Sequence, residues 1–184
     1  MPKTTPGSPP DEELLRQIAS GDSSALETLY ERHSVPVYNY LLRLVGEVPA
    51  AEDLLQEVFI AVWRGAGSYR QLSSVKTWVL SIAHHRAVSW LRRRRKFSLF
   101  EDVHILDSRP GPELQAFSGW EVEQLQQALE GLSVNHRAVI ELTFVHGLSY
   151  REIAQVMGCP EGTVKSRMSY ALRQLTGLLK GKGV

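Results

Sequence analysis

Cations and aromatic rings gather in one part of this sequence, in a pattern suited to binding nucleic acid. The side chains concerned are Tyr69, Arg70, Lys76, His85 and Arg86. Cations neutralise phosphates, and aromatic rings stack on unpaired bases for about 1–3 kcal/mol per base. The same segment ends in five consecutive cations at residues 92–96, more than a helix dipole alone would call for. This pattern therefore predicts that this part of the chain binds single-stranded nucleic acid.

A second polar group lies on a predicted helix-turn-helix near the C-terminus. Ser149 and Glu152 form a capping box that begins one short helix, and Gly158 tolerates the positive φ just past its end. Pro160 suits the start of a second helix. The helical period gives that helix an apolar stripe of Val164, Met168, Ala171, Leu172 and Leu175. Away from the stripe lie Thr163, Lys165, Ser166, Arg167, Ser169, Tyr170 and Arg173.

This pattern has two interpretations, a DNA-binding helix-turn-helix and an αα-hairpin within a helical bundle. The second helix carries no acidic residue after Glu161. A merely solvated face usually mixes both signs of charge, whereas contact with phosphates requires Lys or Arg. The DNA-binding interpretation is therefore favoured, with Ser166 and Tyr170 facing base edges and Lys165 and Arg167 flanking them beside the phosphates.

A third group occupies one face of a helix predicted over residues 50–63. Asp53, Gln56, Glu57 and Ile60 follow the spacing i, i+3, i+4, i+7, opposite the side expected to be buried. An isoleucine among carboxylates and an amide resembles the apolar centre and polar rim of a protein interface. A single exposed isoleucine is also common on any protein surface, so both interpretations stay open.

No catalytic or metal site is predicted. Adjacent His84 and His85 point about 100° apart on a helix, and no further ligand completes a zinc site, so both are expected at the surface or facing DNA. The lone Cys159 is expected to be a small packing residue, and it fits a reducing cytoplasm. No cofactor is expected.

The composition is that of a folded protein, and its acidic and basic residues are concentrated in different parts of the chain. The chain has 184 residues and a net charge of +1. Residues 11–63 carry ten acidic and three basic residues, whereas residues 64–96 carry nine basic residues and no acidic one. This partition suggests two partners, one of them polyanionic. Residues 1–10 have four prolines and no signal-peptide pattern, and no run of transmembrane length occurs.

The expected fold is all-α, with two small helical domains joined by a flexible linker. Helices are predicted over residues 11–20, 22–46, 50–63, 75–96, 120–130 and 134–145, followed by the helix-turn-helix, with Pro36 kinking or breaking the second. In the helix over residues 75–96, the side chains expected to face inward are Val75, Trp78, Val79, Ile82 and Ala83. The domains are placed at residues 11–97 and 120–180, after a disordered lead-in (1–10) and around the linker (98–119).

Together, these features resemble a sigma-70 family RNA polymerase sigma factor of the extracytoplasmic function (ECF) type. Three stretches carry the resemblance: residues 51–59, residues 76–83, and residues 147–154 with 162–167. Residues 11–97 resemble the family's region 2 and residues 120–180 its region 4, so the resemblance leaves out only the lead-in and the linker.

The resemblance implies a non-enzymatic transcription initiation factor. In relatives, positions matching Asp53, Gln56, Glu57 and Ile60 dock on the beta-prime clamp helices of core polymerase. The loop at residues 65–74 and the helix from Lys76 match the segment that opens the minus-ten element and captures a flipped base. Region 4 reads the minus-thirty-five element in the major groove, through positions matching Lys165, Ser166, Ser169 and Tyr170, and meets the beta flap. The resemblance also implies an anti-sigma factor as a partner.

The sequence departs from the family at several positions. Relatives commonly carry Arg-Asn at His84-His85, Asp at Ser89, and arginines at Tyr170 and Leu172, so the promoter preference of a relative does not transfer. The alternative function is an ordinary DNA-binding repressor or activator, which leaves the charge partition and the Ile60 face without a purpose. A nuclease or metal-dependent hydrolase lacks a ligand cluster or a nucleophile–base pair.

Overall fold

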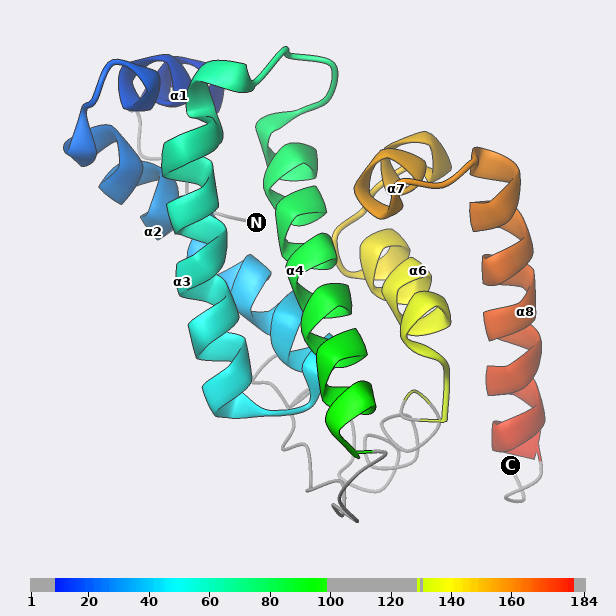
Figure 1. The fold of residues 1–184 in the computed structure, drawn as a ribbon. Helices are drawn as coiled ribbons and strands as arrows, with labels where there is room; N and C mark the ends of the chain where they lie inside the picture. Colours follow the sequence, from blue (N-terminus) through cyan, green and yellow to red (C-terminus); the bar gives the residue numbers. More distant parts are fainter. Residues whose placement is uncertain (1–8, 99–128, 130, 181–184) are drawn as a thin grey trace, which may run out of the picture. The chain divides into compact units, whose positions relative to one another are not determined.

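Helices account for all the regular secondary structure in the part of the chain that the computed structural model describes, residues 9–98, 129 and 131–180 (Figure 1). Contacts divide the chain between Val103 and His104 into two compact units, called unit 1 and unit 2 below. The all-α prediction is confirmed. Ser98, the first residue of the predicted linker, ends a helix instead. The rest of the linker, most of the predicted helix over residues 120–130, and most of the lead-in lie outside the described residues.

Unit 1 is built from α1 (Asp11–Ala19), α2 (Ser23–Val45), α3 (Val48–Gly65), the short η1 (Ala66–Ser68) and α4 (Val75–Ser98). α2 packs against α1, α3 and α4, so it is the central helix of this unit. Asp22 caps its start by accepting from the backbone N–H of Ser24 and Ala25, and Gly46 ends it with a φ of 78°. The largest buried side chains include Leu29, Tyr40, Leu41, Leu54 and Leu80.

α2 continues through Pro36, so of the two predicted effects the break is wrong, and the kink stays a prediction. A proline inside a helix costs about 3 kcal/mol, because it removes one hydrogen bond and crowds the preceding turn. Buried side chains lie on both sides of Pro36, among them Leu29, Val37 and Leu41. Burying such a side chain stabilises the fold by about 1.5–3 kcal/mol, so packing of the two halves outweighs the local penalty.

The buried face of α4 differs from the predicted one. Val75, Val79 and Ala83 are buried as expected, whereas Trp78 and Ile82 are only partly covered. Thr77, Leu80 and His84 are buried in addition. α4 packs against both α2 and α3. Because two helices cover it, its buried face is wider than the predicted one and is centred on a different side of the helix.

One carboxylate fastens the first helix of unit 1 to α2. The two Asp11 oxygens lie 2.6 Å from Arg32 Nη1 and 2.6 Å from His33 Nε2. Burial raises the pKa of Asp11, but the hydrogen bonds and charges of His33 and Arg32 outweigh burial and hold that pKa below its ordinary value of 3.8. A charged Asp11 therefore stabilises the docking of α1 on α2.

Asp11→Asn is expected to lower the free energy of unfolding by about 1–2 kcal/mol at pH 7, since it weakens two charge-assisted hydrogen bonds. Because the folded pKa is depressed, the contribution of the carboxylate is present above pH 3.8 and is lost as the pH falls through the folded pKa. Denaturant unfolding should therefore show a gap between the variant and the parent that closes below about pH 4. Glu27→Gln, at an exposed acid on α2, is the matched control; an equal loss there would show a general charge effect.

Unit 2 contains α6 (Val134–Phe144), α7 (Tyr150–Met157) and α8 (Glu161–Lys180). The predicted capping box is present: Ser149 Oγ accepts from the backbone N–H of Glu152, and Glu152 Oε2 accepts from the backbone N–H of Ser149. Gly158 then adopts a φ of 60°, which brings the chain to α8 through the short turn of a helix-turn-helix. α8 packs against α6 and α7.

The buried stripe of α8 is narrower than predicted. Val164, Met168 and Ala171 are buried and Leu175 is partly covered, but Leu172 is 44% exposed. Leu172 lies at the edge of the stripe, about 80° from Val164 around the helix axis, where neither α6 nor α7 covers it. Among the described residues, no helix combines the length and apolar character needed to cross a membrane.

Candidate functional site

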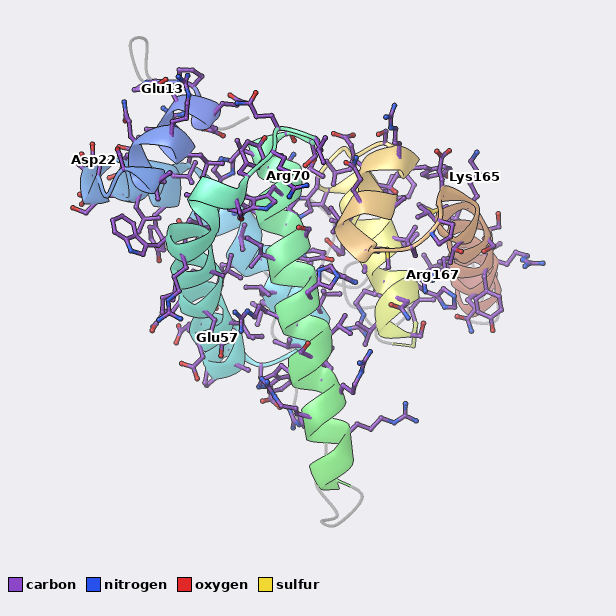
Figure 2. All side chains as sticks on the ribbon, turned by 45° about the horizontal axis from the view of Figure 1, so that its top comes forward. Glu13, Asp22, Glu57, Arg70, Lys165 and Arg167 are labelled. Carbon is purple, nitrogen blue, oxygen red and sulfur yellow. The ribbon has the colours of Figure 1, made fainter. Side chains whose placement is uncertain are left out.

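Three surfaces carry the side chains singled out from the sequence: the outer face of α3, the loop before α4 with the outer part of α4, and the outer face of α8. The first two lie on unit 1 and the third on unit 2. Figure 2 labels Glu57 on α3, Arg70 in the loop that precedes α4, and Lys165 and Arg167 on α8.

The outer face of α3 has an apolar centre within a polar surround. Asp53 and Gln56 are exposed, Glu57 is partly exposed, and Ile60 is 50% exposed. The opposite side of the same helix is buried in unit 1 through Leu54, Leu55, Val58, Phe59 and Val62. Trp63, one turn beyond Ile60, is also exposed and extends the apolar centre, which the sequence analysis did not predict.

The loop after η1 is held by an aromatic pair. The ring of Tyr69 lies 5.3 Å from the ring of Trp78, and its hydroxyl donates to the carbonyl oxygen of Ser73 at 2.5 Å. Burial and the negative charges of Glu12 and Asp11 raise the pKa of Tyr69, so this hydroxyl keeps its proton. Gly65 lies beside this pair, since a Cβ there would lie 3.4 Å from the Trp78 ring, at ordinary van der Waals distance.

The tip of this loop is open. Arg70 and Leu72 are exposed, and between them Gln71 has a φ of 57°, which non-glycine residues seldom adopt. Such backbone strain is found often where a loop is shaped to hold a ligand. Tyr69 therefore supports the loop through Trp78 and Ser73, and Arg70 lies exposed at the loop tip.

The outer part of α4 presents His85 and Arg86, both exposed, while Lys76 in its first turn is partly covered. His85 Nδ1 donates to the carbonyl oxygen of Ser81 at 2.7 Å, which leaves Nε2 directed away from that bond. Arg86 Nη1 lies 3.2 Å from Glu57 Oε2. This ion pair joins the α4 surface to the α3 face, and sequence reasoning, which treated the two sets separately, missed it.

Arg94, in the basic run at the end of α4, has a structural role. Arg94 pairs with Glu47, and its guanidinium lies over the ring of Trp90 at 5.2 Å. The carboxylate and the ring together give Arg94 a fixed position at the end of α4. Arg92 and Arg93 are exposed and can follow a phosphate backbone.

His84 is not at the surface, contrary to the expectation from the sequence. Its exposed fraction is 4%, and its Nδ1 lies 2.8 Å from the hydroxyl of Tyr40 on α2. A buried imidazole needs a hydrogen-bond partner, and the one it finds is 44 residues away. Only His85 of the pair faces outward. Across the described residues, no group of three or more His, Cys, Asp or Glu side chains is placed to hold a metal ion.

The outer face of α8 separates into an open side and an edge beside α6. Ser166, Ser169 and Arg173 are exposed and lie away from the buried stripe. Lys165, on one flank, lies 3.0 Å from Glu161 in an exposed pair that contributes little to stability. Thr163, on the other flank, is partly covered.

Two predicted DNA-contacting side chains are already engaged within unit 2. Arg167 is partly covered, and its Nη1 lies 3.5 Å from Cys159 Sγ in the turn. Tyr170 is 44% exposed, and its ring stacks on His136 of α6 with a centroid distance of 4.6 Å and an interplanar angle of 29°. Tyr170 thus lies at the edge beside α6, and Ser166 is the better-placed of the two residues predicted to face bases.

Comparison with known proteins gives two matches to protein families. Residues 29–97 match the sigma-70 region 2 family, and residues 122–175 match the sigma-70 region 4 family. The match to region 2 contains the α3 and α4 surfaces, and the match to region 4 contains the helix-turn-helix.

Whole proteins are similar over most of the chain. The ECF RNA polymerase sigma factor SigK of Mycobacterium ulcerans is 34% identical over 179 residues, which cover 90% of this chain and 91% of SigK. The ECF RNA polymerase sigma factor SigX of Bacillus subtilis is 33% identical over 156 residues, which cover 81% of this chain and 80% of SigX. The sigma factor RpoE of Bartonella quintana, solved in complex with the anti-sigma factor NepR, superposes with a TM-score of 0.72 at 27% identity, covering 84% of this chain and 96% of RpoE.

Proposed function

The chain belongs to the sigma-70 family of RNA polymerase sigma factors, in its ECF group, and on that premise we propose how its surfaces divide the work of promoter recognition and transcription initiation. Unit 1 docks on core polymerase and holds the minus-ten element, and unit 2 reads the minus-thirty-five element. The polymerase supplies the chemistry, so the role of this chain is binding and not catalysis. Its place of action is the cytoplasm, where the polymerase works.

Docking on core polymerase uses the outer face of α3. Exposed Ile60 within a surround of Asp53, Gln56 and Glu57 is the observation that carries this assignment. A solvated helix face has no need of an aliphatic side chain at its centre, whereas an interface places such a residue inside a polar rim. The partner surface is the beta-prime clamp helices. The beta flap is the corresponding partner of unit 2.

Capture of the melted minus-ten element uses the loop before α4 and the outer part of α4. Arg70 at the exposed loop tip and His85 and Arg86 on α4 are placed to meet the displaced strand, with Lys76 at the start of the helix. Tyr69 contributes by packing its ring against Trp78, which supports the loop. Cations along a groove beside aromatic rings bind single strands with little base preference. We therefore assign affinity for the melted strand to the cations of α4, and preference for particular bases to the loop.

Reading of the minus-thirty-five element uses the open side of α8. Ser166 and Ser169 carry hydroxyls that can donate to or accept from base edges, and Arg173 adds a cation on the same side. Thr163, Lys165 and Arg167 lie at the flanks, toward the phosphates, and Tyr170 lies at the edge beside α6.

Ser166→Ala is expected to change which upstream sequences are used, by about 1–3 kcal/mol at the base pair it contacts, with little change in salt dependence. Arg173→Ala, which removes a cation, should instead weaken all sequences alike and reduce the salt slope by about one unit. The measurement uses reconstituted holoenzyme on a library of upstream elements at several salt concentrations. Thr176→Ala is the matched control, because Thr176 and Ser166 each donate to a carbonyl of α8, Leu172 and Thr163 respectively.

If Arg173→Ala shifts sequence preference while Ser166→Ala does not, the bases are read further along α8, toward its C-terminus, than proposed, because the two residues lie on nearly the same side of the helix. If neither substitution differs from Thr176→Ala, α8 does not read the upstream element.

Control by an anti-sigma factor is part of the proposal. The similar RpoE of Bartonella quintana was solved with its anti-sigma factor NepR. In this chain, the exposed Ile60 and Trp63 on α3 would be blocked by any inhibitor that competes with core polymerase. Co-purification from the source cell should recover polymerase subunits and such an inhibitor in separate complexes.

A further inference from the structure

His136, which lies on α6 and outside the recognition helix, contacts the surface proposed to read DNA. Its ring stacks on Tyr170 with centroids 4.6 Å apart, and Arg167 on the same edge of α8 acts on it electrostatically. Both rings are partly exposed. The two stacked rings therefore lie at the edge of the reading surface and not in the hydrophobic core.

The cap of α6 fixes the position of the His136 ring. Ser133 is the N-cap residue, and its Oγ accepts from the backbone N–H of His136 at 3.4 Å. The same Oγ lies 3.0 Å from His136 Nδ1. A hydroxyl that accepts from the backbone can donate its own hydrogen to Nδ1, which ties the imidazole to the helix start.

The neutral imidazole suits this arrangement. Burial and the positive charge of Arg167 lower the pKa of His136 below its ordinary value. An uncharged ring with Nδ1 accepting from Ser133 offers a flat face for stacking, without repelling Arg167. The ring is thus held from one side by the cap and presents its face to Tyr170.

We propose that His136 is a positioning residue for promoter selection: by stacking on Tyr170, it holds the phenol in one orientation at the edge of α8, so that Tyr170 discriminates among upstream base pairs. This inference rests on the proposed function of α8. Tyrosine has two side-chain torsions, and without a neighbour its ring samples several rotamers. His136 removes that freedom, so the base preference given by Tyr170 depends on a residue 34 positions earlier in the chain.

The test compares full-length variants in reconstituted holoenzyme on a library randomised in the upstream element. Tyr170→Ala identifies the base positions at which preference depends on the phenol. His136→Ala is expected to reduce preference at those same positions by about two- to tenfold, the range that an aromatic pair contributes. His136→Phe, which keeps a ring that can stack, should restore most of it. In the double variant, His136→Ala should add nothing to Tyr170→Ala.

Asn135→Ala, at the exposed residue before His136, is the matched control for α6 and should leave preference unchanged. Thermal unfolding of each variant separates loss of the fold from loss of positioning. If His136→Ala unfolds, the test relies on His136→Phe, which should keep the base preference that Tyr170→Ala loses.

The proposal is overturned if folded His136→Ala keeps the parent preference, if it alters preference at different base positions, or if His136→Phe loses the preference as His136→Ala does. If Tyr170→Ala itself changes nothing while Ser166→Ala does, α8 still reads DNA and only the role of the His136–Tyr170 pair falls. If neither changes preference, the proposed function of α8 falls with it.

Discussion

Replacing Ile60 by Asp is expected to weaken association with core polymerase by about thirtyfold or more, because central apolar residues of interfaces contribute 2 kcal/mol or more. The side chain is 50% exposed in the free protein, so the fold loses little when it becomes polar. The new carboxylate would also add to the charge of Asp53 and Glu57 on the same face. Affinity is measured by titrating labelled chain with core polymerase, and thermal unfolding is followed in parallel.

Val35→Asp provides a matched control for this substitution. Val35 is a branched aliphatic residue, 62% exposed on α2 and outside the proposed docking face. It should keep the parent affinity while undergoing the same chemical change. Equal losses for both variants would mean that an added carboxylate anywhere on unit 1 weakens binding. Unfolding of Ile60→Asp alone would mean that Ile60 stabilises the fold.

Replacing Arg86 by Gln is expected to reduce formation of the open promoter complex by about tenfold, the scale of one hydrogen bond to a charged group. Because one cation is lost from a single-strand contact, the salt slope should fall by about 0.7. The measurement uses saturating core polymerase, so that differences in docking do not enter.

Glu57→Gln tests whether Arg86 acts by contacting DNA or by forming a structural ion pair. It breaks the same 3.2 Å contact from the α3 side and leaves the Arg86 cation in place. If Arg86 holds DNA, Glu57→Gln should open promoters as well as the parent or better. If the two variants lose activity equally, the ion pair itself is what matters, and Arg86 does not hold DNA.

The features predicted well from the sequence are those set by neighbouring residues. The capping box of Ser149 and Glu152, the positive φ of Gly158 and the start of α8 after Pro160 need only a few residues each, and all are present. The exposed face around Ile60 was also predictable, because spacing along one helix fixes which side chains share a face.

The features predicted poorly depend on partners far along the chain. His84 is buried because Tyr40 on another helix satisfies its Nδ1, and no local pattern encodes that pairing. Tyr170 was expected, with Ser166, opposite the buried stripe, whereas its stack on His136 of α6 places it at the edge of the outer face. Leu172 matched the apolar period, yet its side chain is 44% exposed. In each case the period fixes the direction of a side chain, and tertiary packing decides what it meets.

Transcription from purified components tests the central claim most directly. The full chain is mixed with core polymerase and a library of DNA randomised at both promoter elements, and the 5′ ends of the transcripts are sequenced. The account predicts transcripts that require the factor, start at a fixed distance from two selected elements, and disappear with Ile60→Asp but not with Val35→Asp. Transcripts that start without the factor, or sequence-specific binding of the free chain to duplex DNA with no factor-dependent initiation, would contradict it.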